Sequence, residues 1–218
     1  ADTAPDVSTL GALAARLRSR YALTIALVTL GGLLIRVIAL GHQALWRDEA
    51  FTDLVSRRSW LDMYAAVRSD SAPPLSYALT HLAAGISSSV AMIRVPAALA
   101  GTALIPLGAA LGKRLGGARA GICAALVCAV MPALVLPSRE ARMYALAGTL
   151  GMAMALTMWR AVERPDRGRL AVHAAVVAAA LMTDYVLTVA VSISAGALAV
   201  RSAAPGLKPY VVVVGVAA

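Results

Sequence analysis

Long apolar runs separated by short polar stretches dominate the chain. Residues 21–40 hold one charged side chain, Arg36, and further apolar runs follow at residues 91–112, 118–137, 143–159, 170–183 and 186–200. About 20 helical residues match the ~30 Å hydrocarbon core of a bilayer, since each residue adds about 1.5 Å to a helix. The pattern predicts an all-α polytopic membrane protein with about six transmembrane helices.

The last apolar run covers only residues 210–218, which is about 14 Å of helix. This length is roughly half of a bilayer core, and it predicts a partial seventh span. We therefore expect residues 1–218 to be the N-terminal part of a longer transmembrane domain whose C-terminal remainder is missing.

The composition agrees with helices in lipid. Hydrophobic residues make up 60% of the chain and charged residues 14%, which is too apolar for a soluble domain with runs of this length. The runs do not alternate with period two, as the strands of an outer-membrane barrel do. The net charge of +9 is divided among short clusters between the runs, which is typical of membrane topology, so we expect no nucleic-acid partner.

The basic clusters predict the orientation. The cluster before the first run places residues 1–20 in the cytoplasm by the positive-inside bias. If residues 41–90 lie wholly outside, every later cluster also falls inside, whereas a span at residues 75–86 would turn the next three clusters outward. Those residues number only about a dozen, so we interpret them as an interfacial or partly embedded helix, begun by Pro73 and Pro74.

The predicted outer loop, residues 41–90, carries most of the candidate chemistry. Ser59 is placed to cap a short helix whose apolar side we expect on the membrane surface. That side comprises Trp60, Leu61, Met63, Tyr64 and Val67.

Asp48 and Glu49 lie a few residues beyond the first run, close to the low-dielectric membrane surface. A carboxylate beside Arg47 or Arg94 would stay ionised there and could take a proton from a substrate hydroxyl. The pair could also hold a divalent cation with substrate oxygens, although the sequence has no metal motif. The alternatives are solvated loop acids, or acids that balance a helix dipole.

Several charged residues on the outer side need partners. Arg139 and Arg142 could pair with Glu140 or bind an anionic phosphate, and Arg94 poses the same question. Arg36 lies at membrane depth, where charges are usually functional or paired, and Asp184 could be a partner for Arg36 or Arg94. Asp70 precedes the rigid Pro-Pro turn, which would fix it at the interface or let it cap the following helix.

Four short motifs in order resemble the membrane glycosyltransferases of the protein O-mannosyltransferase group (glycosyltransferase family 39 and its bacterial relatives, with a GT-C fold). The resemblance covers about residues 20–200, although many relatives have a histidine where this chain has Ala72. The motifs are Trp46-Arg47-Asp48-Glu49-Ala50-Phe51-Thr52, Asp70-x-x-Pro73-Pro74-Leu75, Ile93-Arg94-Val95-Pro96-Ala97 and Glu140-Ala141-Arg142-Met143-Tyr144-Ala145-Leu146.

The resemblance implies an inverting transfer of a sugar, with mannose favoured, from a polyprenyl-phosphate donor to an acceptor hydroxyl on the extracytoplasmic face. The acceptor would be a protein, lipid or glycan. Carried onto this chain, Asp48 is the general base and Glu49 positions the acceptor or assists a cation. Donor phosphate and substrate would be bound by residues among Arg47, Asp70, Arg94, Glu140, Arg142 and Tyr144.

Two other classes of function compete with the enzyme. A transporter would place its polar residues in the middle of its spans, whereas the acids here gather in one outer loop. A non-catalytic membrane scaffold is the other alternative. The Ala- and Arg-rich composition is typical of a high-GC bacterium such as an actinobacterium, so we expect a bacterial cell membrane.

Overall fold

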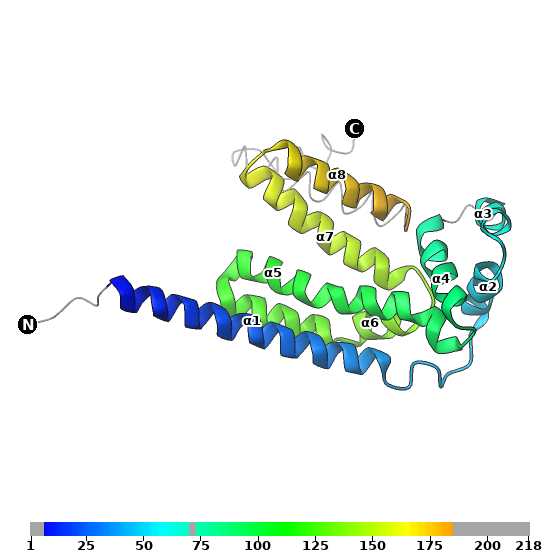
Figure 1. Ribbon diagram of the computed structural model, residues 1–218, viewed down its shortest axis with the longest axis horizontal. Helices are drawn as coiled ribbons and strands as arrows, with labels where there is room; N and C mark the ends of the chain where they lie inside the picture. The colour runs from blue at the N-terminus through cyan, green and yellow to red at the C-terminus, as the bar shows by residue number, and fades with distance from the viewer. Residues whose placement is uncertain (1–6, 70–72, 185–218) are drawn as a thin grey trace, which may run out of the picture.

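The computed structural model describes residues 7–69 and 73–184, and all regular secondary structure in those ranges is helical (Figure 1). Three of these helices are long and apolar enough to cross a membrane: α1 (Val7–Val37), in its part Arg18–Val37, α5 (Val90–Val130) and α7 (Tyr144–Glu163). The all-α prediction is thus confirmed for the described chain. The run at residues 170–183 becomes α8 (Arg167–Leu181), with 15 residues, and the two later runs lie outside the described ranges.

Helix α5 is a hairpin of two arms, which correspond to the second and third apolar runs. The arms meet at Gly116 and Gly117, and Gly117 has a φ of +77°, which a side chain would disfavour. Beyond the turn the arms pack closely through small residues: a Cβ on Gly112 would lie 2.8 Å from the Ala120 carbonyl oxygen. Small residues allow two helix backbones to approach in this way.

The second arm ends at Val130, whereas the apolar run predicts a helix that continues to residue 137. Pro132 has no N–H to donate to the Cys128 carbonyl, and the chain continues as the short α6 (Pro132–Val135) and the 3-10 helix η1 (Leu136–Arg139). The buried Arg36 guanidinium replaces the missing donor, with Nη2 2.9 Å from the Cys128 oxygen and Nη1 3.1 Å from the Ala129 oxygen. Arg36 therefore caps the C-terminal end of this arm, where a cation is favoured.

Three short helices gather at one end of the bundle: α2 (Arg47–Ser56), α3 (Trp60–Ser69) and α4 (Pro74–Ile86) (Figure 1). Helix α4 has 13 residues and begins at the proline pair, as expected. Ser59 caps α3 as predicted, since its Oγ accepts from the Asp62 N–H at 3.2 Å.

The orientation of α3 corrects one expectation. Met63 and Val67 are buried and belong to one apolar cluster with Val55 and Tyr77, instead of lying on a membrane surface. The other three members of the predicted apolar side are exposed: Trp60, Leu61 and Tyr64. The predicted apolar side of α3 therefore contributes two residues to the protein interior and three to the exposed surface.

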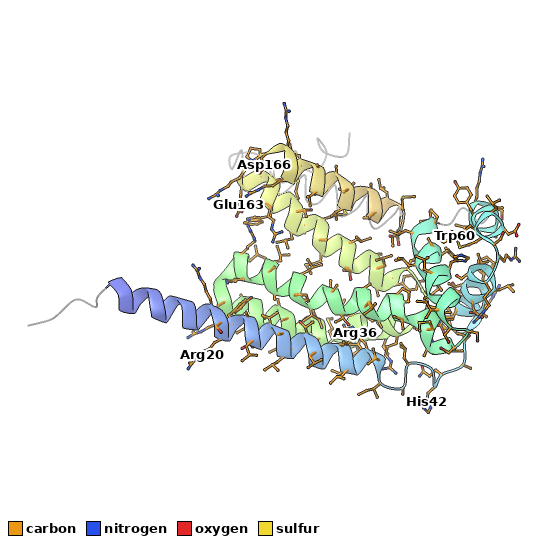
Figure 2. The ribbon with its side chains drawn as sticks, in the orientation of Figure 1. Arg20, Arg36, His42, Trp60, Glu163 and Asp166 are labelled. Atoms are coloured by element: carbon orange, nitrogen blue, oxygen red, sulfur yellow. The ribbon has the colours of Figure 1, made fainter. Side chains whose placement is uncertain are left out.

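The basic clusters gather at the opposite end of the bundle. Lys113 Nζ lies 4.4 Å from the centre of the Tyr21 ring, and Arg114 forms an ion pair with Glu163 at 2.5 Å. Figure 2 shows Arg20 and Glu163 at this end, far from Trp60. The fold thus brings the described basic clusters to one end of the bundle.

Candidate functional site

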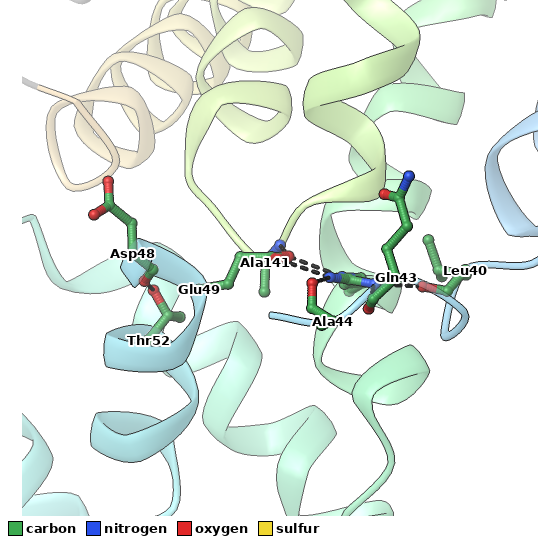
Figure 3. A network of polar contacts seen from close by, with 8 residues as sticks. Leu40, Gln43, Ala44, Asp48, Glu49, Thr52 and Ala141 are labelled. Carbon is green, nitrogen blue, oxygen red and sulfur yellow. Dashed lines mark hydrogen bonds and ion pairs between the residues drawn. The ribbon is translucent and has the colours of Figure 1, made fainter. Parts of the chain in front are cut away.

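Asp48 and Glu49 occupy the first turn of α2, where acidic side chains are favoured by the helix dipole. Adjacent helical residues point in different directions, and the two carboxylates lie in different environments. Glu49 is fully buried and turned toward Ala141, whereas Asp48 points away from that contact and has 41% of its side chain exposed (Figure 3). The pair predicted from sequence is therefore divided into an interior and a surface carboxylate.

Glu49 forms a two-pronged ion pair with Arg94 of α5. Arg94 Nε donates to Glu49 Oε1 at 2.8 Å, and Nη2 donates to Oε2 at 2.7 Å. The backbone N–H of Ala141 also donates to Oε1, at 2.7 Å. This carboxylate thus connects α2, α5 and the segment that leads into α7.

The remaining N–H groups of Arg94 reach backbone carbonyls of the segment after α1. Nη1 donates to Leu40 and Gln43 at 2.8 and 3.0 Å, and Nη2 donates to Ala44 at 3.3 Å (Figure 3). All five N–H groups of the guanidinium therefore have acceptors within the protein. This arrangement leaves none for a donor phosphate, and it favours a positioning role for Arg94 over the expected phosphate contact.

The charge of Glu49 is stabilised despite its burial. Burial alone disfavours the ionised form, but the hydrogen bonds from Arg94 and Ala141 and the charge of Arg94 outweigh it. The pKa of Glu49 therefore lies below its ordinary value. Glu49 stays an acceptor at neutral pH and holds the start of α2 against Arg94.

Arg142 faces Asp48 with long contacts. Its Nη2 lies 3.8 Å from Asp48 Oδ2, and its Nη1 donates to Thr52 Oγ1 at 3.4 Å. Its Nε is buried without a partner in the described part of the chain. Arg142 also lies beside the Tyr144 ring, with 5.9 Å from Cζ to the ring centre. Unlike Arg94, Arg142 keeps donors that a bound anion could take.

Glu140 is close enough to Arg94 and Arg142 to interact with the charges of both. Burial raises the pKa of Glu140, the nearby charge of Glu49 raises it further, and Arg94 and Arg142 only partly offset this. Arg139, which the sequence suggested as a partner of Glu140, instead donates to the Ile35 carbonyl of α1 at 2.6 Å. Glu140 therefore binds a proton more readily than an ordinary glutamate.

The structure brings together six of the eight candidate residues: Asp48, Glu49, Arg94, Glu140, Arg142 and Tyr144. Arg47 begins α2 and is exposed, and Asp70 lies outside the described residues. Sequence reasoning missed Thr52, although its position one helical turn after Asp48 was a usable signal. It also missed the Ala141 N–H, for which a sequence gives no signal.

The expected joint binding of a divalent cation by Asp48 and Glu49 does not fit this geometry. Both oxygens of Glu49 are engaged by Arg94 or Ala141, so of these two residues only Asp48 offers a carboxylate to a ligand. Comparisons with protein-family models, with curated proteins and with solved structures find no match to this chain.

Proposed function

We propose that this chain is part of a membrane glycosyltransferase that moves a sugar, with mannose favoured, from a polyprenyl-phosphate donor to an acceptor hydroxyl. One observation carries the proposal: the accessible carboxylate of Asp48 faces the under-used guanidinium of Arg142 at 3.8 Å. A base and a cation at this spacing suit a reaction in which a hydroxyl loses a proton while a phosphate gains charge. The sequence resemblance to the protein O-mannosyltransferase group is consistent with this chemistry.

Asp48 takes the proton of the acceptor hydroxyl, and the oxygen attacks the anomeric carbon of the donor. The bond from that carbon to the phosphate oxygen breaks, the sugar inverts, and the polyprenyl phosphate leaves. Arg142 stabilises the negative charge that develops on the phosphate. The ion pair of Glu49 and Arg94 holds α2, and with it Asp48, in place.

The side chains around Arg142 are largely apolar. The crevice beside it, lined among others by Leu79, Pro96 and Leu146, measures only about 10 Å³, which is room for about one water molecule and not for a prenyl chain. In the proposed topology the N-terminus is cytoplasmic, six helices and part of a seventh cross the cell membrane, and residues 41–90 are extracytoplasmic. The acceptor is a protein, a lipid or a glycan.

The test replaces Asp48 by Asn in the full-length protein and measures transfer of labelled mannose from polyprenyl-phosphate mannose in isolated membranes. Removal of a general base typically slows a reaction by about 100- to 10,000-fold. Asp53→Asn is the matched control, because Asp53 lies in the same helix and pairs with Arg57 instead. Transfer that is unchanged in Asp48→Asn, or lost equally in both variants, contradicts the assignment of Asp48 as the base.

A further inference from the structure

A basic groove lies at the end of the bundle opposite Asp48. It has a volume of about 840 Å³ and is formed where the first arm of α5 ends, α7 ends and α8 begins. Figure 2 shows Glu163 and Asp166 at this end. The 20 residues of α7 separate the groove from the Asp48 site by about 30 Å, the length of such a helix. The groove therefore cannot share a ligand headgroup with that site.

The charges of the groove are only partly paired. Four arginines and two acids line it, and the acids are engaged: Glu163 with Arg114 at 2.5 Å and Asp166 with Arg169 at 2.9 Å. Arg160 and Arg164 have no acidic partner in the described part of the chain. Two guanidinium groups that share one groove and lack a counter-ion favour a phosphate, which accepts several hydrogen bonds at once.

Apolar side chains beside the groove favour a lipid as the source of that phosphate. Val172 lines the groove and is 55% exposed. Trp159 is 41% exposed, and its Nε1 donates to Glu163 Oε1 at 2.6 Å. A tryptophan with an apolar body outward and its N–H on a polar group is typical of the membrane interface.

We infer that this groove binds the phosphate of an anionic phospholipid, with Arg160 and Arg164 on the headgroup and Trp159 and Val172 along the start of the acyl chains. Basic pockets between membrane helices bind such headgroups. The inference rests on the membrane placement proposed above and is independent of sugar transfer.

The test uses Trp159 as a reporter of bound lipid. The chain is reconstituted in phosphatidylcholine nanodiscs in a Trp46→Phe/Trp60→Phe background, which leaves Trp159 as the only tryptophan. Phosphatidylglycerol with brominated acyl chains is then titrated in, and its quenching is compared with that of brominated phosphatidylcholine. We expect the anionic lipid to be preferred, with a contribution of about fivefold from each of the two arginines.

Two double variants with the same change in net charge distinguish a specific lipid site in the groove from general electrostatic attraction of anionic lipid. Arg160→Gln/Arg164→Gln should abolish the preference, whereas Arg119→Gln/Arg167→Gln, at the same end but outside the groove lining, should retain it. Circular dichroism confirms that each variant is folded, and native mass spectrometry of the wild type counts retained phosphatidylglycerol independently.

Three results would overturn the inference. An equal loss of the preference for phosphatidylglycerol in both variants would show that the preference comes from general surface charge and not from the groove. Binding of inorganic phosphate without any preference for phosphatidylglycerol would assign the groove to a soluble anion. Absence of quenching by either lipid would also overturn the membrane placement, whereas equal quenching by both would leave that placement intact and remove only the lipid site.

Discussion

Arg94 holds Glu49 by two hydrogen bonds of 2.7 and 2.8 Å, and both side chains are almost completely buried, with 3% and 1% exposed. The pair joins α2 to α5, and through the carbonyls that Arg94 also contacts it joins both helices to the end of α1. In a buried pair, each charge is tolerated because the other is present. The geometry of Asp48, one residue before Glu49, therefore depends on Arg94.

Breaking this pair from either side should destabilise the protein strongly. We expect Glu49→Gln and Arg94→Met each to reduce the free energy of unfolding by about 3–5 kcal/mol, because the remaining charge is left buried and unpaired. The double variant should lose much less than the sum of the two. Denaturant titration in detergent measures all three, and additive losses would contradict the coupling.

Stability should respond to Glu140 only above acidic pH. Because its pKa is raised in the folded protein, Glu140 begins to oppose folding as the pH rises past the ordinary carboxyl value of about 4.3 and does so fully once the pH exceeds the folded value, whereas below about 4.3 it is protonated in both states. Glu140→Gln should therefore raise the melting temperature at pH 7–8 and change it little at pH 4. A shift of equal size at both pH values would indicate a packing effect instead.

Replacement of Arg142 should slow the proposed transfer more than it weakens donor binding. We expect Arg142→Gln to lower kcat by about 100-fold with a small change in KM, because charge on the phosphate develops mainly in the transition state. Arg142→Lys should recover part of the rate, since it keeps the charge without the planar fork. Arg58→Gln is the control, because Arg58 is exposed in the segment between α2 and α3, and this change should leave kcat unchanged. A rise in KM alone would assign Arg142 to ground-state binding.

Replacement by alanine should have opposite effects on stability at two glycines, one in the turn of the α5 hairpin and one inside α7. Gly117→Ala places a side chain at a φ of +77° and should destabilise the protein by about 1–2 kcal/mol. Gly148→Ala lies in the interior of α7 with open space around the new Cβ, and it should stabilise by up to about 1 kcal/mol. Thermal unfolding of both variants checks the opposite signs, and equal effects would contradict the conformational argument.

Local signals in the sequence were sufficient for several elements. The Ser59 cap and the proline start of α4 depend on side chains within a few residues, and both are found where they were expected. The apolar runs likewise predicted helices, because length and hydrophobicity are properties of a segment alone. The end of the second α5 arm was misplaced because the apolar pattern continues through Pro132, although the backbone hydrogen bonding does not.

The site depended on information that a single sequence does not contain. Which of two adjacent acids turns inward is decided by the helices that pack against α2, so Asp48 and Glu49 could not be distinguished beforehand. The partners of Arg94 and Arg36 are mostly backbone carbonyls, which have no residue signature. The roles of Asp48 and Arg142 in sugar transfer stay predictions.

The cap formed by Arg36 has a consequence for how the protein is made. Its acceptor on Cys128 lies 92 residues later in the chain. In the proposed topology, α1 therefore enters the membrane before the ribosome has produced the carbonyls that accept from its arginine. Until the second arm of α5 arrives, this charge depends on water or on the interface for its solvation. In that topology, completion of the hairpin supplies the acceptors that the arginine of the first helix lacks when it is inserted.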